Sequence, residues 1–348
     1  MGTSKPFEKN DEMKAGLLKY DDGARELRRE GGPIVTTLQI SLSCLQEKRQ
    51  SASKLLSLMS FFDGQGIAES LLHDQSGLDL AFDDDIQELQ DYSLISKMDV
   101  HTAFAMHRLV QVATHAWLKK HDQLEKPRKQ FINILSSRFP KGSYENWAVC
   151  QPLFPHVLSA MKHNEEQPFP EEIMLQWASV LNNASEYARK IGTMRDSEKM
   201  ASQSMDTRNK ILGPEHPETL RSMNNLASTY WNQGRYEEAE KLNVQVREAH
   251  KRILGPEHPH TLRSMYHLDM TRILRTLEGI RRAEGPGSGG TRAYSWTQSA
   301  YDSLFESMKF LTTWKIPRVS NTLYHLSIAI LVSSFFFFFF FFGEESLY

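Results

Sequence analysis

A segment of seven residues, ILGPEHP, occurs twice in this chain of 348 residues, first at 211–217 and again at 253–259. The match continues beyond the segment, because TLRSM at 219–223 returns at 261–265. Both pairs have a spacing of 42 residues, and self-similarity at one fixed period is the signature of a repeat architecture. We therefore expect this part of the fold to be built from stacked copies of one small structural unit.

One repeat unit has the pattern of two amphipathic helices joined by a tight turn. Gly234 lies between the two runs of apolar residues, where a helix–helix turn needs a residue that tolerates positive φ. The apolar residues at helical spacing are Leu220, Met223, Leu226, Ala227 and Tyr230 in the first run, and Tyr236, Ala239, Leu242 and Val246 in the second. This pattern predicts an antiparallel helix pair in which Ala227 and Ala239 pack closely.

Glycines and prolines predict where the loop between units begins and ends. Gly213 and Gly255 occupy the C-terminal stop position of a helix, and the proline after each glycine cannot continue that helix. Pro217 and Pro259 fit the first turn of the next helix, where the missing N–H is not needed. The residues expected to define the repeat are Gly213, Pro214, His216, Pro217, Ala227, Tyr230, Gly234, Tyr236, Ala239, Gly255, Pro256, His258 and Pro259.

A weaker copy of the unit precedes the complete one, with Ala184, Tyr187 and Gly192 at corresponding positions and one residue of slippage. Over residues 184–268 the sequence resembles the kinesin-light-chain type of tetratricopeptide repeat, in the version common in fungal NLR-like proteins. The resemblance implies a right-handed superhelix of helix pairs. Its concave face would bind a peptide, another protein surface or the chain's own regulatory domain.

Residues 34–120 have another pattern, which predicts helices and a small hairpin. Helices are expected at 51–62 and around Ile86, short strands at 92–95 and 102–106, and a final helix that ends near Leu118. This order favours a winged-helix arrangement.

Three segments of this region carry a second resemblance. TLQIS at 37–41, LLSLMSFFDGQGI at 55–67 and MHRLVQ at 106–111 resemble the winged-helix end of an NB-ARC signalling ATPase. The fold class expected for the chain is thus mainly α, with a winged-helix-like module followed by an α-α superhelix of tetratricopeptide-like helix pairs.

The remaining segments complete the predicted domain organisation. Residues 164–170 are expected to form a hinge, because they are polar and rich in proline. The predicted domains are the end of an ARC-like helical subdomain at 1–33, the winged-helix-like domain at 34–120, a helical linker at 121–170, the repeats at 171–268, and a disordered or aberrant tail at 269–348.

The expected tail contains eight consecutive phenylalanines at 335–342. With the preceding apolar residues they give a segment at 326–342 of marginal length for a membrane span. A polyphenylalanine tract has no pattern of polar and apolar residues that would place one face in a core. The sequence repeat is also expected to stop at Leu268. The favoured interpretation is a translated frameshift or intron, and the alternative is a C-terminal membrane anchor.

No chemistry-bearing motif predicts an enzyme. The sequence contains no GxxxxGK followed by Ser or Thr, so the loop that cradles nucleotide phosphates is missing. ADP or ATP would be a cofactor only if a separate P-loop domain supplied that loop, and no metal site is expected. The resemblance places His107 at the position that contacts the nucleotide's terminal phosphate, against the simpler interpretation of a histidine packed at a strand–helix junction. The loop histidines, His216, His258 and His260, are expected to be turn residues.

Charge and composition narrow the function further. The net charge is -2, which disfavours general attraction to nucleic acid. The first 30 residues are polar and charged, so we expect a cytoplasmic protein. The favoured function is a protein-interaction scaffold or sensor of an NLR-like signalling protein, with a protein or peptide partner on the concave face. The alternatives are a winged-helix nucleic-acid binder and a non-functional truncated gene product.

Overall fold

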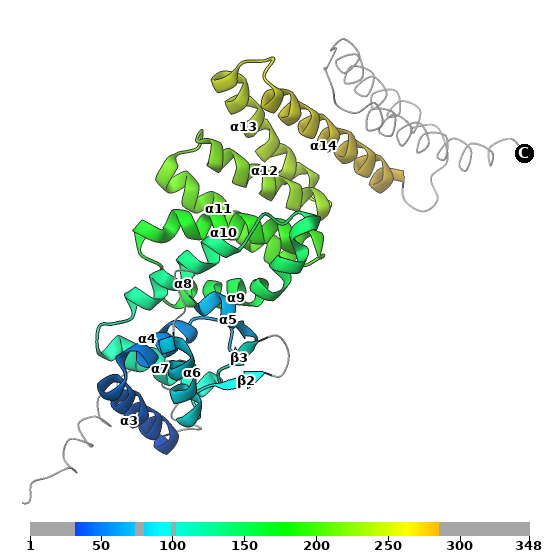
Figure 1. Cartoon of the computed structure of the whole chain (residues 1–348). Coiled ribbons are helices and arrows are strands. Elements are labelled where there is room, and N and C mark those ends of the chain that lie inside the picture. The colour runs from blue at the N-terminus through cyan, green and yellow to red at the C-terminus, as the bar shows by residue number, and fades with distance from the viewer. Residues whose placement is uncertain (1–31, 74–79, 99–101, 285–348) are drawn as a thin grey trace, which may run out of the picture. The chain divides into compact units, whose positions relative to one another are not determined.

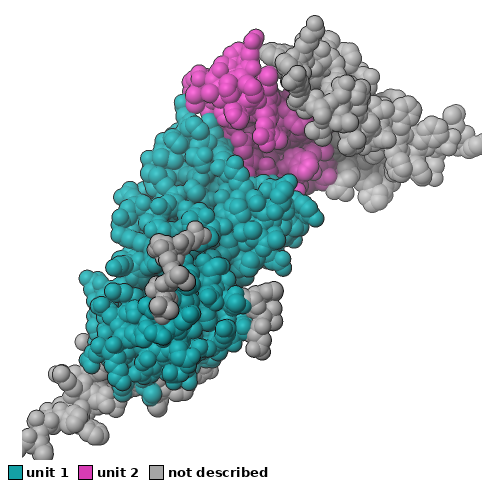
Figure 2. Space-filling model, in the orientation of Figure 1, with its two compact units in different colours: residues 1–222 teal, residues 223–348 magenta. Residues whose placement is uncertain are grey.

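The computed structural model describes residues 32–73, 80–98 and 102–284, which form helices and one small sheet (Figure 1). The chain divides into two compact units, Met1–Ser222 and Met223–Tyr348 (Figure 2). The boundary between them lies within one helix, Pro217–Asn232. The fold is mainly α and contains the predicted helix pairs, so the predicted fold class is confirmed.

The first part of the first unit combines helices with a three-stranded antiparallel sheet of order β1-β3-β2. Phe104 in the central strand pairs with Ile67 on one side and Lys97 on the other. The elements are α3 (Gly32–Lys48), α4 (Gln50–Met59), β1 (Ile67–Ala68), α5 (Glu69–Leu72), α6 (Leu80–Asp91), β2 (Ser96–Met98), β3 (Ala103–Ala105) and α7 (Arg108–Lys120).

The strand predicted at 92–95 is wrong, because these residues form the turn that ends α6. Ser93 has a φ of 55°, a conformation that a strand cannot contain. The N–H of Leu94 donates to the carbonyl of Leu89 at 3.0 Å, which closes the end of the helix. The strand therefore begins only at Ser96.

Three further elements follow, α8 (Glu125–Arg138), the short 3-10 helix η1 (Tyr144–Asn146) and α9 (Trp147–Glu166). The hinge predicted at 164–170 packs into the protein instead. Phe169 is buried, its ring lies 5.4 Å from that of Trp177, and the guanidinium of Arg128 lies 4.6 Å from its centre. Phe169 thus anchors the segment between α8 and α10, whereas residues 165–168 are exposed. One continuous core joins α3 to α11, across both boundaries predicted at 120 and 170.

The repeat region consists entirely of helices. They are α10 (Glu171–Lys190), α11 (Met194–Leu212), α12 (Pro217–Asn232), α13 (Tyr236–Leu254) and α14 (Pro259–Glu284). Gly213 and Gly255 both have a φ of 86°, which an L side chain rarely adopts. The helices that follow these glycines begin at Pro217 and Pro259.

The disordered tail predicted from Asp269 is wrong for residues 269–284, because α14 continues to Glu284 without a break. Leu268, Thr271 and Ile273 are buried, and the Asn243 side-chain amide of α13 donates to the Thr271 hydroxyl at 3.0 Å. Packing against α13 therefore holds residues that we expected to lie in the tail.

The rest of that tail, including the hydrophobic segment at 326–342, lies outside the described residues, as do 1–31 of the expected ARC-like subdomain. Among the helices that the structure describes, none has the length and hydropathy needed to cross a membrane.

Candidate functional site

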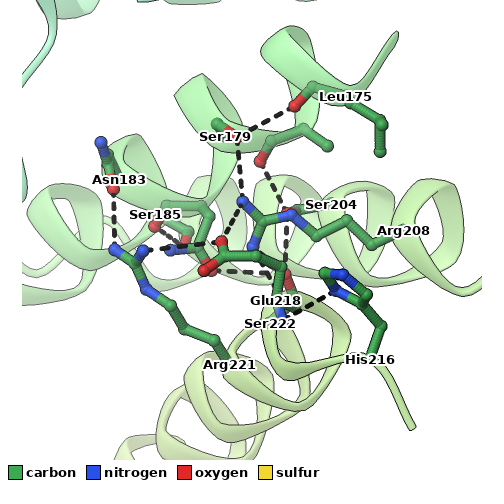
Figure 3. Close-up of polar contacts among 12 residues, drawn as sticks. Leu175, Ser179, Asn183, Ser185, Ser204, Arg208, His216, Glu218, Arg221 and Ser222 are labelled. Carbon is green, nitrogen blue, oxygen red and sulfur yellow. Dashed lines mark hydrogen bonds and ion pairs between the residues drawn. The ribbon is translucent and has the colours of Figure 1, made fainter. Parts of the chain in front are cut away.

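A buried arginine joins three helices of the first unit. Arg208 projects from α11, is 2% exposed, and reaches both α10 and the first turn of α12 (Figure 3). Its guanidinium donates to the Ser179 hydroxyl at 3.0 Å, the Ser222 hydroxyl at 2.8 Å and the Glu218 carbonyl at 3.0 Å. The Glu218 carboxylate lies 2.9 Å from the Arg208 guanidinium and neutralises its positive charge. Burial lowers the pKa of Arg208, and Glu218 opposes that effect.

Serine hydroxyls complete this buried junction. Ser204 donates to the Ala178 carbonyl at 2.7 Å and lies 3.0 Å from the Ser222 hydroxyl (Figure 3). Buried donors are stable only when they are paired, and Arg208 finds an acceptor on each helix it touches. The junction therefore fixes the first turn of α12, which belongs to the first unit, against α10 and α11, and its role is structural.

The outer side of the same junction is open to solvent. The Arg221 side chain is 37% exposed and the Glu218 side chain 43%, whereas Asn183 is half-buried. Arg221 donates to the Asn183 side-chain carbonyl at 3.2 Å and lies 3.6 Å from Glu218 (Figure 3). Asn183 in turn donates to the carbonyl of Phe139 at 3.3 Å. We call Asn183, Glu218 and Arg221 the α10–α12 surface.

The α10–α12 surface is suited to recognising polar groups of a polypeptide. A guanidinium presents donors in a fixed planar fork, and an amide both donates and accepts. Arg208 and its serines hold the helices that carry these groups, so the surface is set before any ligand arrives. In the part of the chain that the structure describes, no group of three or more His, Cys, Asp or Glu side chains could hold a metal ion.

The structure places the predicted repeat residues in loops and helix contacts. His216 lies beside the α10–α12 surface, where its Nδ1 accepts the backbone N–H of Glu218 at 3.2 Å (Figure 3). His258 accepts the N–H of His260 in the same way. Ala227 and Ala239 are buried in the second unit, at 2% and 0% exposure.

His107 lies at a strand–helix junction, but it is exposed and not packed. Its Nδ1 accepts the backbone N–H of Leu109 at 3.2 Å, so the ring caps the N-terminus of α7. The same contact pattern at His216 and His258 shows that this role requires no nucleotide.

Sequence reasoning did not find Arg208, Asn183 or Arg221. One signal was available for two of them. Asn182-Asn183 recurs as Asn224-Asn225, and Arg221 recurs as Arg263, each 42 residues later. Arg208 gave no signal, because the corresponding residue of the next copy is a histidine.

Comparisons with known proteins agree with this architecture. A family model described as tetratricopeptide repeat matches residues 177–218 and 219–260. Another, described as a domain of unknown function (DUF7779), matches residues 44–123. A nucleotide-binding leucine-rich repeat (NLR)-like protein of Hyaloscypha variabilis is 32% identical over 207 residues, which cover 60% of this chain and 20% of that protein.

These findings confirm the resemblance to NLR-like proteins and the presence of tetratricopeptide repeats. The chain spans one fifth of the length of the relative. The repeats are a scaffold fold, and with the relative they support a general function in protein interaction.

Proposed function

We propose that this chain is the interaction module of an NLR-like signalling protein, and that its α10–α12 surface binds an extended segment of a partner protein or of a regulatory domain. The observation that carries the proposal is the arrangement of Asn183, Arg221 and Glu218. These side chains are partly exposed, yet the buried Arg208 fixes the helices that present them.

A polypeptide is the ligand that best matches these groups. An extended segment exposes backbone N–H and C=O groups, and the Asn183 amide has a second lone pair and a second N–H for them beside its contacts with Arg221 and Phe139. Arg221 adds a donor fork for a carboxylate of the partner, and Glu218 limits the surface's positive charge. This mixture of donors and acceptors favours a protein ligand over a nucleic acid, whose phosphates require an excess of basic side chains.

The test begins with a random peptide library displayed on phage and selected against the intact chain. Selected peptides are then titrated by fluorescence anisotropy against the Asn183→Ala and Arg221→Ala variants. We expect Arg221→Ala to weaken binding about tenfold or more, because a hydrogen bond to a charged group contributes about 1.5 to 3 kcal/mol. Asn183→Ala should weaken it by about twofold to tenfold, because a neutral hydrogen bond contributes about 0.5 to 1.5 kcal/mol.

Arg263→Ala provides a matched control, because Arg263 is the exposed counterpart of Arg221 in the next copy of the repeat. Its affinity for the selected peptides should equal that of the unmodified chain. Circular dichroism establishes that all the variants are folded. Equal binding by Arg221→Ala, Asn183→Ala and the unmodified chain would show that the peptides use another surface.

A further inference from the structure

α14 is the first helix of a third helix pair, and no second helix of that pair lies among the residues that the structure describes. α12 and α14 share the sequence TLRSM at the same distance from their initial proline. The two helices can therefore be compared position by position. α12 is followed by α13, which completes its pair, so the comparison shows what α14 lacks.

Burial differs between corresponding positions of the two helices. Met223 and Ala227 of α12 are 8% and 2% exposed. Their counterparts in α14, Met265 and Asp269, are only half-buried, and the neighbouring Tyr266 is 43% exposed. With the half-buried Leu262, these side chains recur at i, i+3, i+4 and i+7 and share one face of the helix. We call Leu262, Met265, Tyr266 and Asp269 the open face of α14.

The acid on the open face distinguishes it from its counterpart. Asp269 occupies the position at which α12 has Ala227. Burial raises the pKa of Asp269, and the charges of Arg272 and Arg247 only oppose this. Arg272 itself is bound to Glu240 of α13 at 2.8 Å. No donor within residues 32–73, 80–98 or 102–284 forms a hydrogen bond to the Asp269 carboxylate. A half-buried carboxylate of this kind is stabilised by an added cation.

We propose that the open face of α14 binds an amphipathic helix of a partner protein, which presents small apolar side chains to Leu262 and Met265 and a Lys or Arg to Asp269. This helix takes the place that α13 has beside α12. The inference concerns residues of the second unit alone, so it stands or falls separately from the α10–α12 surface.

A second copy of this chain is a poorer occupant. Its open face presents three apolar side chains and one acid, with no cation among them. Pairing two open faces would bury both Asp269 carboxylates without a partner, which is strongly unfavourable. The charge of Asp269 thus favours a basic helix of a partner protein over α14 of a second copy of this chain.

The test uses two fluorescent peptides of the α13 sequence, residues 236–254, one unmodified and one with Ala239→Lys. Ala239 is chosen because it is the buried small residue expected to face Ala227 in the preceding pair. Anisotropy titrations use the intact chain and its Asp269→Ala variant. We expect the lysine peptide to bind the intact chain at least about tenfold more tightly than it binds Asp269→Ala. The unmodified peptide should show the reverse preference.

Asp269→Ala should bind the unmodified peptide more tightly than the intact chain does, and the lysine peptide more weakly. A misfolded variant would lose affinity for both peptides, so the two titrations together distinguish the proposal from misfolding. The matched control is Glu257→Gln, which removes an exposed acid from the loop before α14 and should leave both titrations unchanged.

Other occupants give other results. Binding of the lysine peptide to a chain ending at Glu284, but not to the full chain, would assign the open face to the chain's own C-terminal residues. A dimer in light scattering that Tyr266→Asp abolishes would assign it to a second copy. Either result overturns the proposal, as does a failure of the lysine peptide to distinguish Asp269→Ala from the intact chain.

Discussion

Three histidines in this chain perform the same local task. His107, His216 and His258 each accept, at Nδ1, the backbone N–H two residues further on, over 3.2 Å in every case. Each histidine lies where a helix begins, and the first N–H groups of a helix have no partner within it. A neutral imidazole supplies the missing acceptor. The positions are therefore explained by helix capping alone.

From this role we predict that the chain neither hydrolyses nor tightly binds ATP. A single charge-assisted hydrogen bond from His107 would contribute about 1.5 to 3 kcal/mol, whereas micromolar binding requires about 8 kcal/mol. Isothermal calorimetry with ATP and ADP up to millimolar concentration measures this directly. Saturable micromolar binding that His107→Ala abolishes, and that the equivalent cap variant His216→Ala retains, would contradict the prediction.

Small side chains at the centre of the second unit lead to a second prediction. Ala227 and Ala239 are almost fully buried, so neither position has room for three more carbon atoms. Ala227→Leu should lower the free energy of unfolding by about 1 to 3 kcal/mol through overpacking. Urea denaturation measures the change, and Ala148→Leu, at an exposed position of α9, is the matched substitution. An unchanged urea midpoint for Ala227→Leu would show that the two helices are not closely packed there.

At the scale of elements, the segment that follows α4 is held by histidines from two helices. The Phe61 ring lies 4.5 Å from that of His115 in α7 and 5.5 Å from that of His163 in α9. His156, also in α9, accepts the backbone N–H of Asp63 at 3.0 Å. These rings connect α4, α7 and α9 through one buried cluster.

The three histidines of this cluster have pKa values below that of a free imidazole. Burial lowers the pKa of His115 to about 3, and it lowers those of His156 and His163 to about 4. Charge repulsion between His115 and His163, and from Arg128 in α8, acts in the same direction, whereas Asp63 opposes it at His156. Lys162 also disfavours a charge on His163.

The third prediction is that acid destabilises the chain between about pH 6.5 and pH 4. In this range the unfolded histidines bind protons and the folded ones do not, so stability falls as the pH falls. His156 is 1% exposed. Its protonation in the unfolded chain would lower the free energy of unfolding by at most about 2 kcal/mol between pH 7 and pH 5. Thermal melts at pH 7, 6 and 5 should show a smaller loss for His156→Gln. Identical pH profiles for His156→Gln and the unmodified chain would contradict the assignment.

At the scale of the whole molecule, the sequence was most informative where the backbone itself imposes a requirement. A loop that needs positive φ selects Gly213 and Gly255, and a helix start tolerates Pro217 and Pro259, so both signals could be found in single residues. The extent of α14 was missed because its last turns depend on contacts with α13. α3 was also missed, because no helix was predicted between residues 34 and 50.

The α10–α12 surface was harder to predict than the fold. Arg208 meets Ser179 from 29 positions earlier and Ser222 from 14 positions later, and no local pattern joins these residues. Their proximity exists only once α10, α11 and α12 have packed. Asn183 and Arg221 carried a weak signal in the repeat, but their exposure and their contact could be established only from the structure.

The last prediction concerns the stretch of α14 that we first assigned to a tail. A chain ending at residue 268 should be less stable than one ending at 284, because it loses the buried Ile273, the hydrogen bond from Asn243 to Thr271 and both arginine partners of Glu240. Burying an isoleucine contributes about 1.5 to 3 kcal/mol and the hydrogen bond about 1 kcal/mol. Glu240, whose side chain is only 13% exposed, would also keep an unpaired charge.

Urea denaturation of the two truncated chains should therefore show a loss of at least about 2 kcal/mol for the shorter one. Hydrogen exchange should locate that loss in α13, because α13 carries both Asn243 and Glu240. Neither chain contains residues 285–348, so the difference belongs to residues 269–284 alone. Equal midpoints and equal protection of α13 would mean that this stretch adds nothing to the second unit, and that the open face of α14 lacks the rigid support it needs to bind a helix.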